Sequence, residues 1–336
     1  MHGFLGITYH YLREKSSQEL FPRILGNKMD DLRRHIIALR ERYYILSPEE
    51  AFDYMSGKKD FRSRQENLGV LLTFDDGVSD HYKAAEILAE HNIFALFFIP
   101  TCIVADGEPA SPNIIHYALA IYGIDRFLSF YREALEGIGL SVDAHDIIFK
   151  RGVDNPWDTI GEIKKVLKYR LNYTDSRKIL MHMYRNRMLV DNPDILKFMH
   201  LTSRETSDMV KMGHSLGSHT HTHVSVAATE LSQIDYEKEM DFPKRYLEER
   251  FKTNVRSISY PYGLKEDCLT AASLLERSGG YEFAFSVEPK VNEYGSNGLN
   301  LGRYMLSGSD TPETMMRSLE LIEGGRGREA FPTWFS

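Results

Sequence analysis

The apolar positions of this chain form short continuous runs that alternate with stripes of helical spacing. The runs at 4–10 (FLGITYH), 69–77 (GVLLTFDDG) and 94–100 (FALFFIP) each have the length of a buried strand. Between them, residues 32–43 and 79–93 place their apolar side chains on one helical face. Strand, helix and strand joined by short connections predict βαβ units, and hence a parallel sheet.

The pattern changes between about residues 107 and 200. Three segments there, 111–140, 159–171 and 175–189, have helical periodicity, and no strand signal lies between them. They are rich in Tyr, Arg and Lys. We interpret 107–200 as a helical insertion rather than an independent domain.

The α/β pattern resumes after the insertion. Thr202 and Glu205 have capping-box spacing, which predicts the start of a helix that ends at Gly213. Further strands are expected within 256–263, 283–287 and 301–306, with a helix through 268–280. The expected organisation is therefore one domain over 1–336, with a core of 1–106 and 201–310, the insertion, and a C-terminal helix or tail at 311–336.

Composition narrows the classes of function. Apolar residues make up 42% and charged residues 26% of the 336 residues, which is typical of a globular protein with a sizeable core. The formal charge of −7 gives no reason to expect nucleic acid or an anionic membrane as a partner. No apolar run approaches the ~20 residues that span a bilayer, and the first residues lack a secretory signal pattern. With only two cysteines and no disulfide framework, a cytoplasmic enzyme is expected, and the sequence predicts no oligomeric state.

The segment TFDDG places two carboxylates where a buried strand ends. In parallel α/β folds, ligands bind at this end of the strands. Adjacent residues point in different directions there, so Asp75 and Asp76 can have different roles, such as a free base and a metal ligand. Gly77 allows a tight turn into the next helix. A structural role for the two acids as a helix N-cap is an equally good interpretation of this segment alone.

The segment GSHTHTHVSV carries His219, His221 and His223 at alternate positions. On a strand all three would share one face, whereas on a helical turn only the i, i+4 pair would. Imidazole is a common ligand for zinc-like metals, and Asp76 is the obvious carboxylate to join it. Two histidines and a carboxylate with open positions form the ligand set of a hydrolytic metal centre.

Here the sequence resembles the NodB-homology polysaccharide deacetylases, carbohydrate esterase family 4. TFDDG matches the first motif of that family, His219-Thr220-x-x-His223 resembles the second, and YPYG at 260–263 resembles the third as found in poly-N-acetylglucosamine deacetylases. The resemblance covers about 1–105 and 205–310, and the insertion has no equivalent. It implies a distorted (β/α) barrel and one divalent metal ion, with zinc expected and cobalt or nickel able to substitute.

The resemblance also implies residue roles. Asp75 would be the general base, and Asp76, His219 and His223 would be the metal ligands, which leaves His221 off the metal. The backbone N–H of Tyr262, beside Pro261, would lie on the substrate side and stabilise the oxyanion.

Three features depart from the usual family pattern. Val224 stands where the second motif normally has proline, which shapes a turn and is not a ligand, so we discount this departure. Ser259 stands where many relatives have an arginine that holds the base, and Arg303 is a candidate replacement. No histidine follows His223, so the usual late acid histidine is missing. The poly-N-acetylglucosamine branch has circularly permuted motifs with this histidine in a YH pair on the first strand, which makes His10 the candidate general acid.

The expected function is therefore metal-dependent removal of an N-acetyl group from an amino sugar or saccharide. Two alternatives stay open: hydrolysis of another amide (a formamide, a peptidoglycan-type amide or a cyclic amide as in allantoinase) and saccharide binding by a degenerate member. Other residues are given structural interpretations: His214 and His81 as parts of the scaffold, and Trp157 and the insertion tyrosines as core, with sugar stacking as the alternative.

Overall fold

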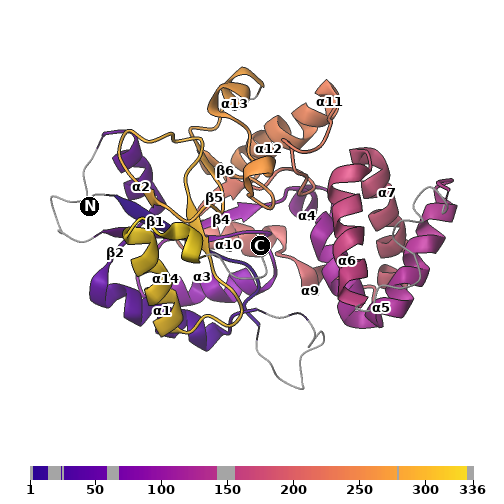
Figure 1. Cartoon of the computed structure of the whole chain (residues 1–336), viewed down its shortest axis with the longest axis horizontal. Coiled ribbons are helices and arrows are strands. Elements are labelled where there is room, and N and C mark those ends of the chain that lie inside the picture. Colours follow the sequence, from indigo (N-terminus) through magenta and orange to yellow (C-terminus); the bar gives the residue numbers. More distant parts are fainter. Residues whose placement is uncertain are drawn as a thin grey trace.

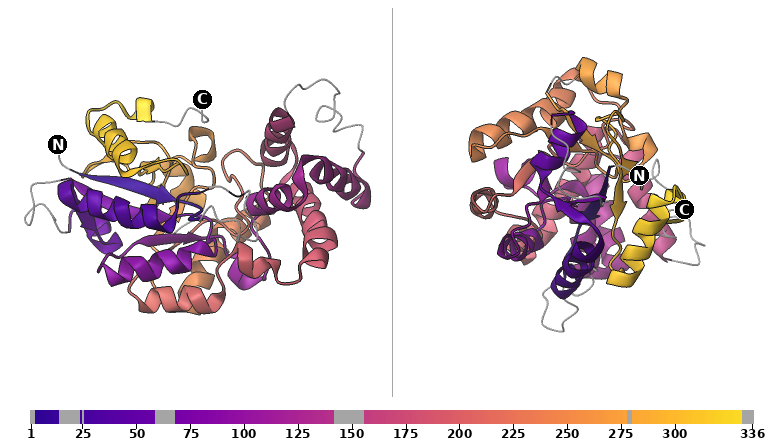
Figure 2. Two further views of the ribbon diagram at one scale, coloured as in Figure 1. Left: turned by 90° about the horizontal axis from the view of Figure 1, so that it is seen from below. Right: turned by 90° about the vertical axis from the view of Figure 1, so that its left-hand side faces the viewer.

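The computed structural model describes residues 3–13, 24, 26–58, 68–141, 156–277 and 280–330. It consists of a strand-and-helix body with a group of helices beside it (Figure 1). The two parts lie side by side in the second view as well (left panel of Figure 2). The side chain of Trp157 lies outside the described residues, so its predicted role stays a prediction.

Parallel strands close into a distorted barrel, as predicted. Along the sheet the order is β7-β6-β5-β4-β3-β1, and β9 pairs with the free side of β1. A parallel bridge between Phe285 and Leu301 joins the end of β7 to the segment before β9 and completes the ring. The strands of the ring are β1 (Phe4–Tyr9), β3 (Gly69–Phe74), β4 (Leu96–Ile99), β5 (Ser215–Ser218), β6 (Ser257–Ser259), β7 (Phe283–Phe285) and β9 (Arg303–Met305).

Two short strands lie outside the ring, and the sequence analysis did not predict them. β2 (Tyr44–Leu46) runs parallel to the first half of β3, and β8 (Val291–Asn292) runs antiparallel to β1. At two or three residues, each is too short to give a hydrophobic period in the sequence.

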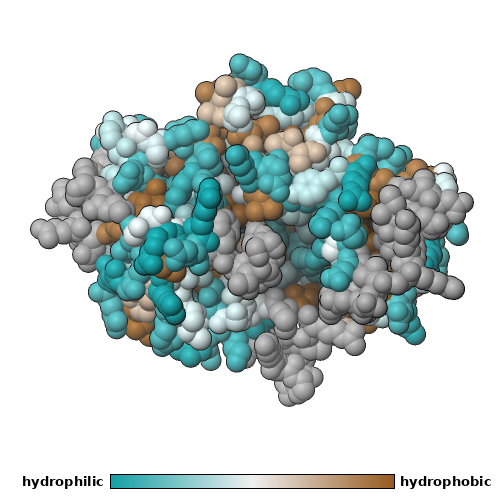
Figure 3. All heavy atoms as spheres, in the orientation of Figure 1, coloured by the Kyte–Doolittle hydropathy of each residue, from teal (hydrophilic) through white to brown (hydrophobic). Residues whose placement is uncertain are grey.

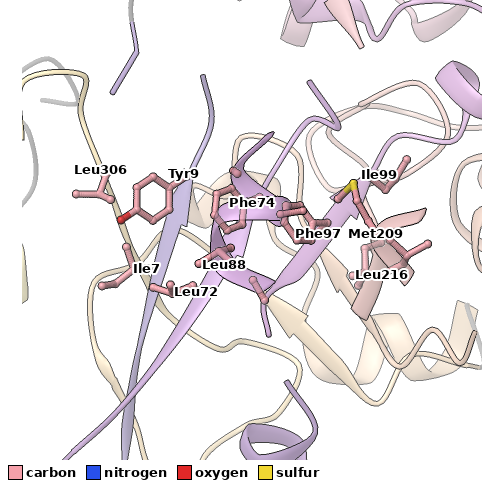
Figure 4. Close-up of a cluster of buried hydrophobic side chains, with 14 of the residues drawn as sticks. Ile7, Tyr9, Leu72, Phe74, Leu88, Phe97, Ile99, Met209, Leu216 and Leu306 are labelled. Atoms are coloured by element: carbon pink, nitrogen blue, oxygen red, sulfur yellow. The ribbon is translucent and has the colours of Figure 1, made fainter. Parts of the chain in front are cut away.

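Strand alternation divides the buried side chains into two sets. Alternate residues of β1, β3 and β4 point outward and pack against the surrounding helices (Figure 4). The outward set includes Ile7, Tyr9, Leu72, Phe74, Phe97 and Ile99. Residues at the intervening positions point into the barrel, where aromatic and polar side chains fill the interior.

Helices cover the outside of the barrel. Several begin with the caps that their sequences encode, among them the capping box of Thr202 and Glu205. The helices of this part are α1 (Met29–Arg42), α2 (Pro48–Met55), α3 (Asp80–Glu90), α4 (Cys102–Ala105), α10 (Ser203–Lys211), α11 (Gln233–Tyr236), η5 (Glu237–Asp241), α12 (Phe242–Phe251), η6 (Lys265–Asp267), α13 (Ala271–Arg277), α14 (Pro312–Glu323) and η7 (Gly327–Ala330).

The segment predicted as a helical insertion consists, in its described part, of helices joined by short turns. Its apolar side chains form a separate buried cluster, which is joined to the barrel through Tyr11 and Val78. The helices are α5 (Ser111–Gly137), α6 (Pro156–Lys165), η3 (Val166–Arg170), α7 (Tyr173–Met183), η4 (Tyr184–Met188), α8 (Leu189–Asp191) and α9 (Ile195–Met199). That the insertion is not an independent domain stays a prediction.

The surface gives no sign of a membrane span. Apolar residues on the face in Figure 3 are scattered among hydrophilic ones, as on an ordinary protein surface. Within the described residues, no helix has the length and apolar character that crossing a bilayer requires.

Candidate metal centre

The two aspartates of TFDDG point in different directions because strand β3 ends between them. Asp75 continues the alternation of β3 and points into the barrel, where it is 2% exposed. Asp76 has a positive φ of 75°, and Gly77, with φ 55°, completes the turn. A side chain at Gly77 would meet Ile103 at 2.7 Å, so this turn requires glycine. The backbone therefore gives the neighbouring carboxylates separate surroundings.

The histidine segment leaves β5 and turns rather than continuing as a strand. Thr220 and His223 both have positive φ, at 58° and 67°. Neither is a glycine, and such residues are typically found where the surrounding structure fixes an unusual backbone. The turn brings His219 and His223 together, with ring centroids 4.6 Å apart and the rings nearly perpendicular.

Three side chains converge at this turn. Asp76 Oδ1 lies 3.3 Å from His219 Nε2 and 3.1 Å from His223 Nε2. It is buried and has no partner in hydrogen-bond geometry. His219 Nδ1 lies 2.8 Å from the Ser259 carbonyl, which can only accept, so Nδ1 carries the proton and the lone pair of Nε2 faces Asp76.

These three residues fit a divalent metal ion. In the part of the chain that the structure describes, they form the one group of at least three His, Cys, Asp or Glu side chains whose ligand atoms lie within 4.8 Å of one another. Two imidazole nitrogens and one carboxylate oxygen suit zinc, with cobalt and nickel as close substitutes. The unpaired Asp76 Oδ1 is the atom that such an ion would satisfy.

His221 points away from the three. Its Nδ1 lies 2.9 Å from Thr101 Oγ1 and its Nε2 lies 2.9 Å from Asp106 Oδ2. Its ring also packs edge-on against Phe242. The middle histidine therefore fastens the turn to the neighbouring strand end of β4.

A buried carboxylate that the sequence analysis missed holds the same turn. Glu239 is fully buried, and its Oε2 accepts hydrogen bonds from the backbone N–H groups of His221 (3.0 Å) and Thr222 (2.8 Å). Its Oε1 accepts from Thr222 Oγ1 at 2.9 Å and from the hydroxyl of Tyr173, which belongs to the insertion. Glu239 comes from the π-helical turn η5, so no local motif marks it.

We expect Glu239→Ala to weaken zinc binding by about tenfold, because outer partners of a metal site typically contribute this much. Leaving two buried N–H groups unpaired should also lower the free energy of unfolding by about 1–3 kcal/mol for each group. Zinc titration and urea unfolding measure the two effects. The matched control is Glu237→Ala, an exposed neighbour on the same turn. Equal zinc affinity in the Glu239 and Glu237 variants would contradict this prediction.

Asp75 is held by Arg303, the residue that the sequence analysis offered as a replacement for the missing arginine. The guanidinium donates to both carboxylate oxygens, at 2.8 Å to Oδ1 and 2.7 Å to Oδ2. Ser259, at the usual arginine position, donates to Asp75 and accepts from Arg303. Burial raises the pKa of Asp75, but Arg303 and His219 more than offset this, and the pKa lies below its ordinary value.

Arg303 is itself fully buried inside the barrel. It also donates to Ser286 O, Thr8 Oγ1 and Thr73 Oγ1, so the barrel interior supplies its remaining partners. A side chain at Gly6 would meet the Arg303 Cγ at 2.6 Å, so glycine on β1 makes room for it.

The other predicted residues surround the same opening. His10 follows β1 and lines the cavity above the barrel, and its backbone carbonyl lies 2.8 Å from His81 Nε2. Tyr262 has a positive φ of 66°, and its ring packs edge-on against His223 at 4.8 Å. The N–H of Tyr262 has no hydrogen-bond partner among the described residues. Pro261 precedes it but does not line the cavity.

The two histidines assigned to the scaffold are bound within it. His214 Nδ1 accepts from Ala95 N at 3.2 Å, and its Nε2 lies 3.0 Å from the Ala85 carbonyl. His81 packs against Phe74 and Phe97. Because His81 also contacts the His10 carbonyl, it helps to fix the backbone that carries His10.

A cavity of about 730 Å³ lies between the strand ends and the helical insertion. Its volume is in the range of small-molecule sites. The barrel contributes Asp75, Asp76, His219 and His223, and the insertion contributes residues from α5, α6, η3 and α7. The insertion therefore forms one wall of the candidate active site, a role that its helical periodicity alone did not reveal.

Lys168 connects this wall to the third motif. Its Nζ lies 3.7 Å from the centroid of the Tyr262 ring, and it forms an ion pair of 3.0 Å with the fully buried Asp267. Tyr169 OH donates to the same carboxylate at 3.3 Å. The insertion thus holds in place the tyrosine that packs on the candidate metal ligand His223.

The structure thus brings together a buried acid, a group of two histidines and one carboxylate, and a cavity at the same end of the barrel. The family model described as polysaccharide deacetylase matches residues 165–279. This range includes the histidine turn and YPYG, and the match to the family model is limited to it. A comparison with curated protein sequences found no match.

Solved structures share the fold over nearly the whole chain. The Streptococcus pyogenes deacetylase PplD, in complex with acetate, is 18% identical at a TM-score of 0.56, with 94% of this chain and 98% of that one covered. IcaB from Ammonifex degensii is 17% identical at 0.54, with 96% and 97% covered. A de-N-acetylase from Aggregatibacter actinomycetemcomitans is 14% identical at 0.53, with 94% and 98% covered. These structures show the fold that the chain shares, and the family model adds a polysaccharide deacetylase match over residues 165–279.

Proposed function

We propose that this protein is a metal-dependent hydrolase that removes an N-acetyl group from an amino sugar. The proposal rests on one observation: a candidate metal-ligand group and a candidate general base lie side by side at the same end of the barrel. The rings of His219 and His223 converge on Asp76 Oδ1, a carboxylate oxygen with no hydrogen-bond partner among the described residues. Asp75 is held beside them by Arg303. The match of residues 165–279 to the polysaccharide deacetylase family model supports the acetylated saccharide as substrate.

Asp76, His219 and His223 would hold the metal ion, and zinc is our first choice. A bound ion of this kind supplies Lewis-acid polarisation of the acetamide carbonyl and lowers the pKa of water. The His219 ring is already oriented for the task by its hydrogen bond to the Ser259 carbonyl.

The remaining groups account for the protons and charges of amide hydrolysis. Asp75 would accept a proton from the attacking water, because Arg303 and Ser259 keep it ionised and oriented. The N–H of Tyr262 has no hydrogen-bond partner among the described residues and would donate to the oxyanion that forms from the carbonyl. His10 would protonate the leaving nitrogen, so that acetate and a free amine are released.

The insertion restricts what can reach this centre. It forms one wall of a cavity of about 730 Å³ over the strand ends, a volume that suits a short saccharide. Acetate release from a panel of N-acetylated sugars and oligosaccharides tests both the reaction and the size limit. Release of formate or opening of a cyclic amide in place of acetate release would assign the scaffold to another amide.

Removal of metal is expected to abolish acetate release, and added zinc should restore it. Metal binding to the folded state should also stabilise the protein, by about 2.7 kcal/mol when free zinc is 100 times its dissociation constant. Acetate assays and thermal unfolding of chelator-treated and zinc-loaded protein measure the two effects. Full activity in protein shown to be free of metal would contradict the proposal.

A further inference from the structure

The two walls of the cavity carry opposite charges. Among the described lining residues, the insertion contributes basic side chains and no carboxylate, whereas the barrel contributes carboxylates and no lysine or arginine. The basic residues are Lys164, Lys165, Lys168 and Arg177. Because the whole chain has a formal charge of −7, the average composition of the chain does not predict a basic wall here.

Three of the four basic residues are already paired with carboxylates of the protein. Lys165 contacts Glu162 at 2.9 Å, Lys168 contacts Asp267 at 3.0 Å and Arg177 contacts Glu108 at 3.1 Å. Lys164 differs, because no carboxylate among the described residues lies within ion-pair distance of it. It is the basic residue of the cavity with a charge left for a ligand.

The neighbours of Lys164 form a chain of donors. Lys164 Nζ lies 3.4 Å from His116 Nε2, and an ammonium group can only donate. His116 Nδ1 then carries the ring proton and faces the Tyr11 hydroxyl at 3.2 Å. Tyr11 also accepts from Asn113 Nδ2 at 2.6 Å, and no described residue takes its own hydroxyl hydrogen, which can therefore be donated to a ligand. Lys164, His116 and Tyr11 all line the cavity.

Lys164, His116 and Tyr11 line the same cavity as the candidate metal centre. Burial and the charge of Lys164 lower the pKa of His116 to about 3, and the charges of Asp76 and His223 also act on it. Lys164 is exposed at the edge of the cavity, and partial desolvation lowers its pKa, with no carboxylate among the described residues to raise it again. Because Lys164 lines the same cavity of about 730 Å³ as Asp76, His219 and His223, an anion bound by it would belong to the same small substrate as the acetamide group.

Building on the proposed deacetylase function, we propose that the substrate carries an anionic group, which Lys164 binds while the acetamide lies at Asp76, His219 and His223. The shared chemistry is an oxyanion, either a phosphate ester or a carboxylate. Tyr11 supplies a second, neutral donor to the same group. This assigns the insertion a role in substrate specificity.

The test compares matched sugars with zinc-loaded protein. N-acetylglucosamine is the neutral sugar, its 1-phosphate carries the phosphate ester, and N-acetylmuramic acid carries a carboxylate. We expect kcat/KM for acetate release to be about tenfold higher for at least one anionic sugar, which is the usual value of one charge-assisted hydrogen bond. Lys164→Met should reduce this preference to near one, mainly through KM, and added salt should weaken it in the wild type.

A binding experiment keeps the test independent of turnover. In a zinc-loaded Asp75→Asn background, Lys164→Met should raise the dissociation constant of the preferred anionic sugar by about tenfold. The matched control is Lys178→Met, an exposed lysine of α7 that contacts Asp175 and does not line the cavity. It should leave both the preference and the dissociation constant unchanged.

The outcomes separate this inference from the proposed function. Acetate release from neutral and anionic sugars with equal kcat/KM would overturn the inference and leave the deacetylase intact. So would a Lys164→Met variant that loses the same factor on both kinds of sugar. Absence of acetate release from all three sugars and from the wider saccharide panel would overturn the proposed function, and this inference with it.

Discussion

Replacing Asp75 by asparagine is expected to lower kcat/KM for acetate release by about 10³-fold, within the usual range for loss of a general base. Asparagine has nearly the same shape but cannot take a proton from water. The metal content should stay at the wild-type level, because Asp75 does not belong to the Asp76, His219 and His223 group. Kinetics and metal analysis on the same zinc-loaded preparations measure the two effects.

The matched variant is His219→Ala, which removes a ligand nitrogen but leaves Asp75 and Arg303 in contact. It should lose bound zinc, and its activity should fall for that reason. The roles would be wrongly assigned if Asp75→Asn lost its metal while His219→Ala kept both metal and activity. Wild-type activity in Asp75→Asn with full metal content would remove Asp75 from the reaction.

Replacing Arg303 by methionine should lower the free energy of unfolding by about 3–5 kcal/mol, the typical cost of breaking a buried ion pair. Arg303 is fully buried, and its loss would leave the Asp75 carboxylate inside the barrel without its cation. Urea unfolding measures this change. Activity should fall as well, because the base would no longer be held in place.

Arg303→Lys separates the effect on catalysis from the effect on folding. Lysine keeps the charge but cannot donate to both oxygens of Asp75 in a fork, so we expect a folded protein with about 10²-fold lower activity. The control is Arg256→Met, a buried arginine whose partners, Glu49 and Glu282, are exposed. It should cost less than half as much stability as Arg303→Met. Wild-type activity in Arg303→Lys would show that Arg303 does not position the base.

Much of the fold could be predicted because its signals are local. Strands β1, β3 and β4 carry continuous apolar runs, and α10 begins at the capping box that its sequence encodes. Elements with weak local signals were missed. These include β2 and β8, which have two or three residues, and the helix from Gln233 to Phe251, which is interrupted by the π-helical turn η5.

The residues of the candidate site also fall into two groups, those that a local motif marks and those that it does not. Asp75, Asp76, His219 and His223 stand in short motifs, and a resemblance to one family was enough to select them. Arg303 was named only because Ser259 stands at the position where many relatives have an arginine. Its contact with Asp75 depends on β9 lying beside β1. Glu239 and Lys164 have no motif at all, since each acts through partners that are distant in the sequence.

The sequence by itself determined that this is an α/β chain with a helical insertion and a deacetylase-type set of two aspartates and two histidines. Through the family resemblance it also predicted that the histidine triplet contributes an i, i+4 pair to that set. Only the tertiary structure decided which arginine holds Asp75, which carboxylate holds the histidine turn, and which wall of the cavity is basic. The physical reason is that motifs are read along the chain, whereas ion pairs and cavities depend on distances that only closure of the barrel and docking of the insertion fix.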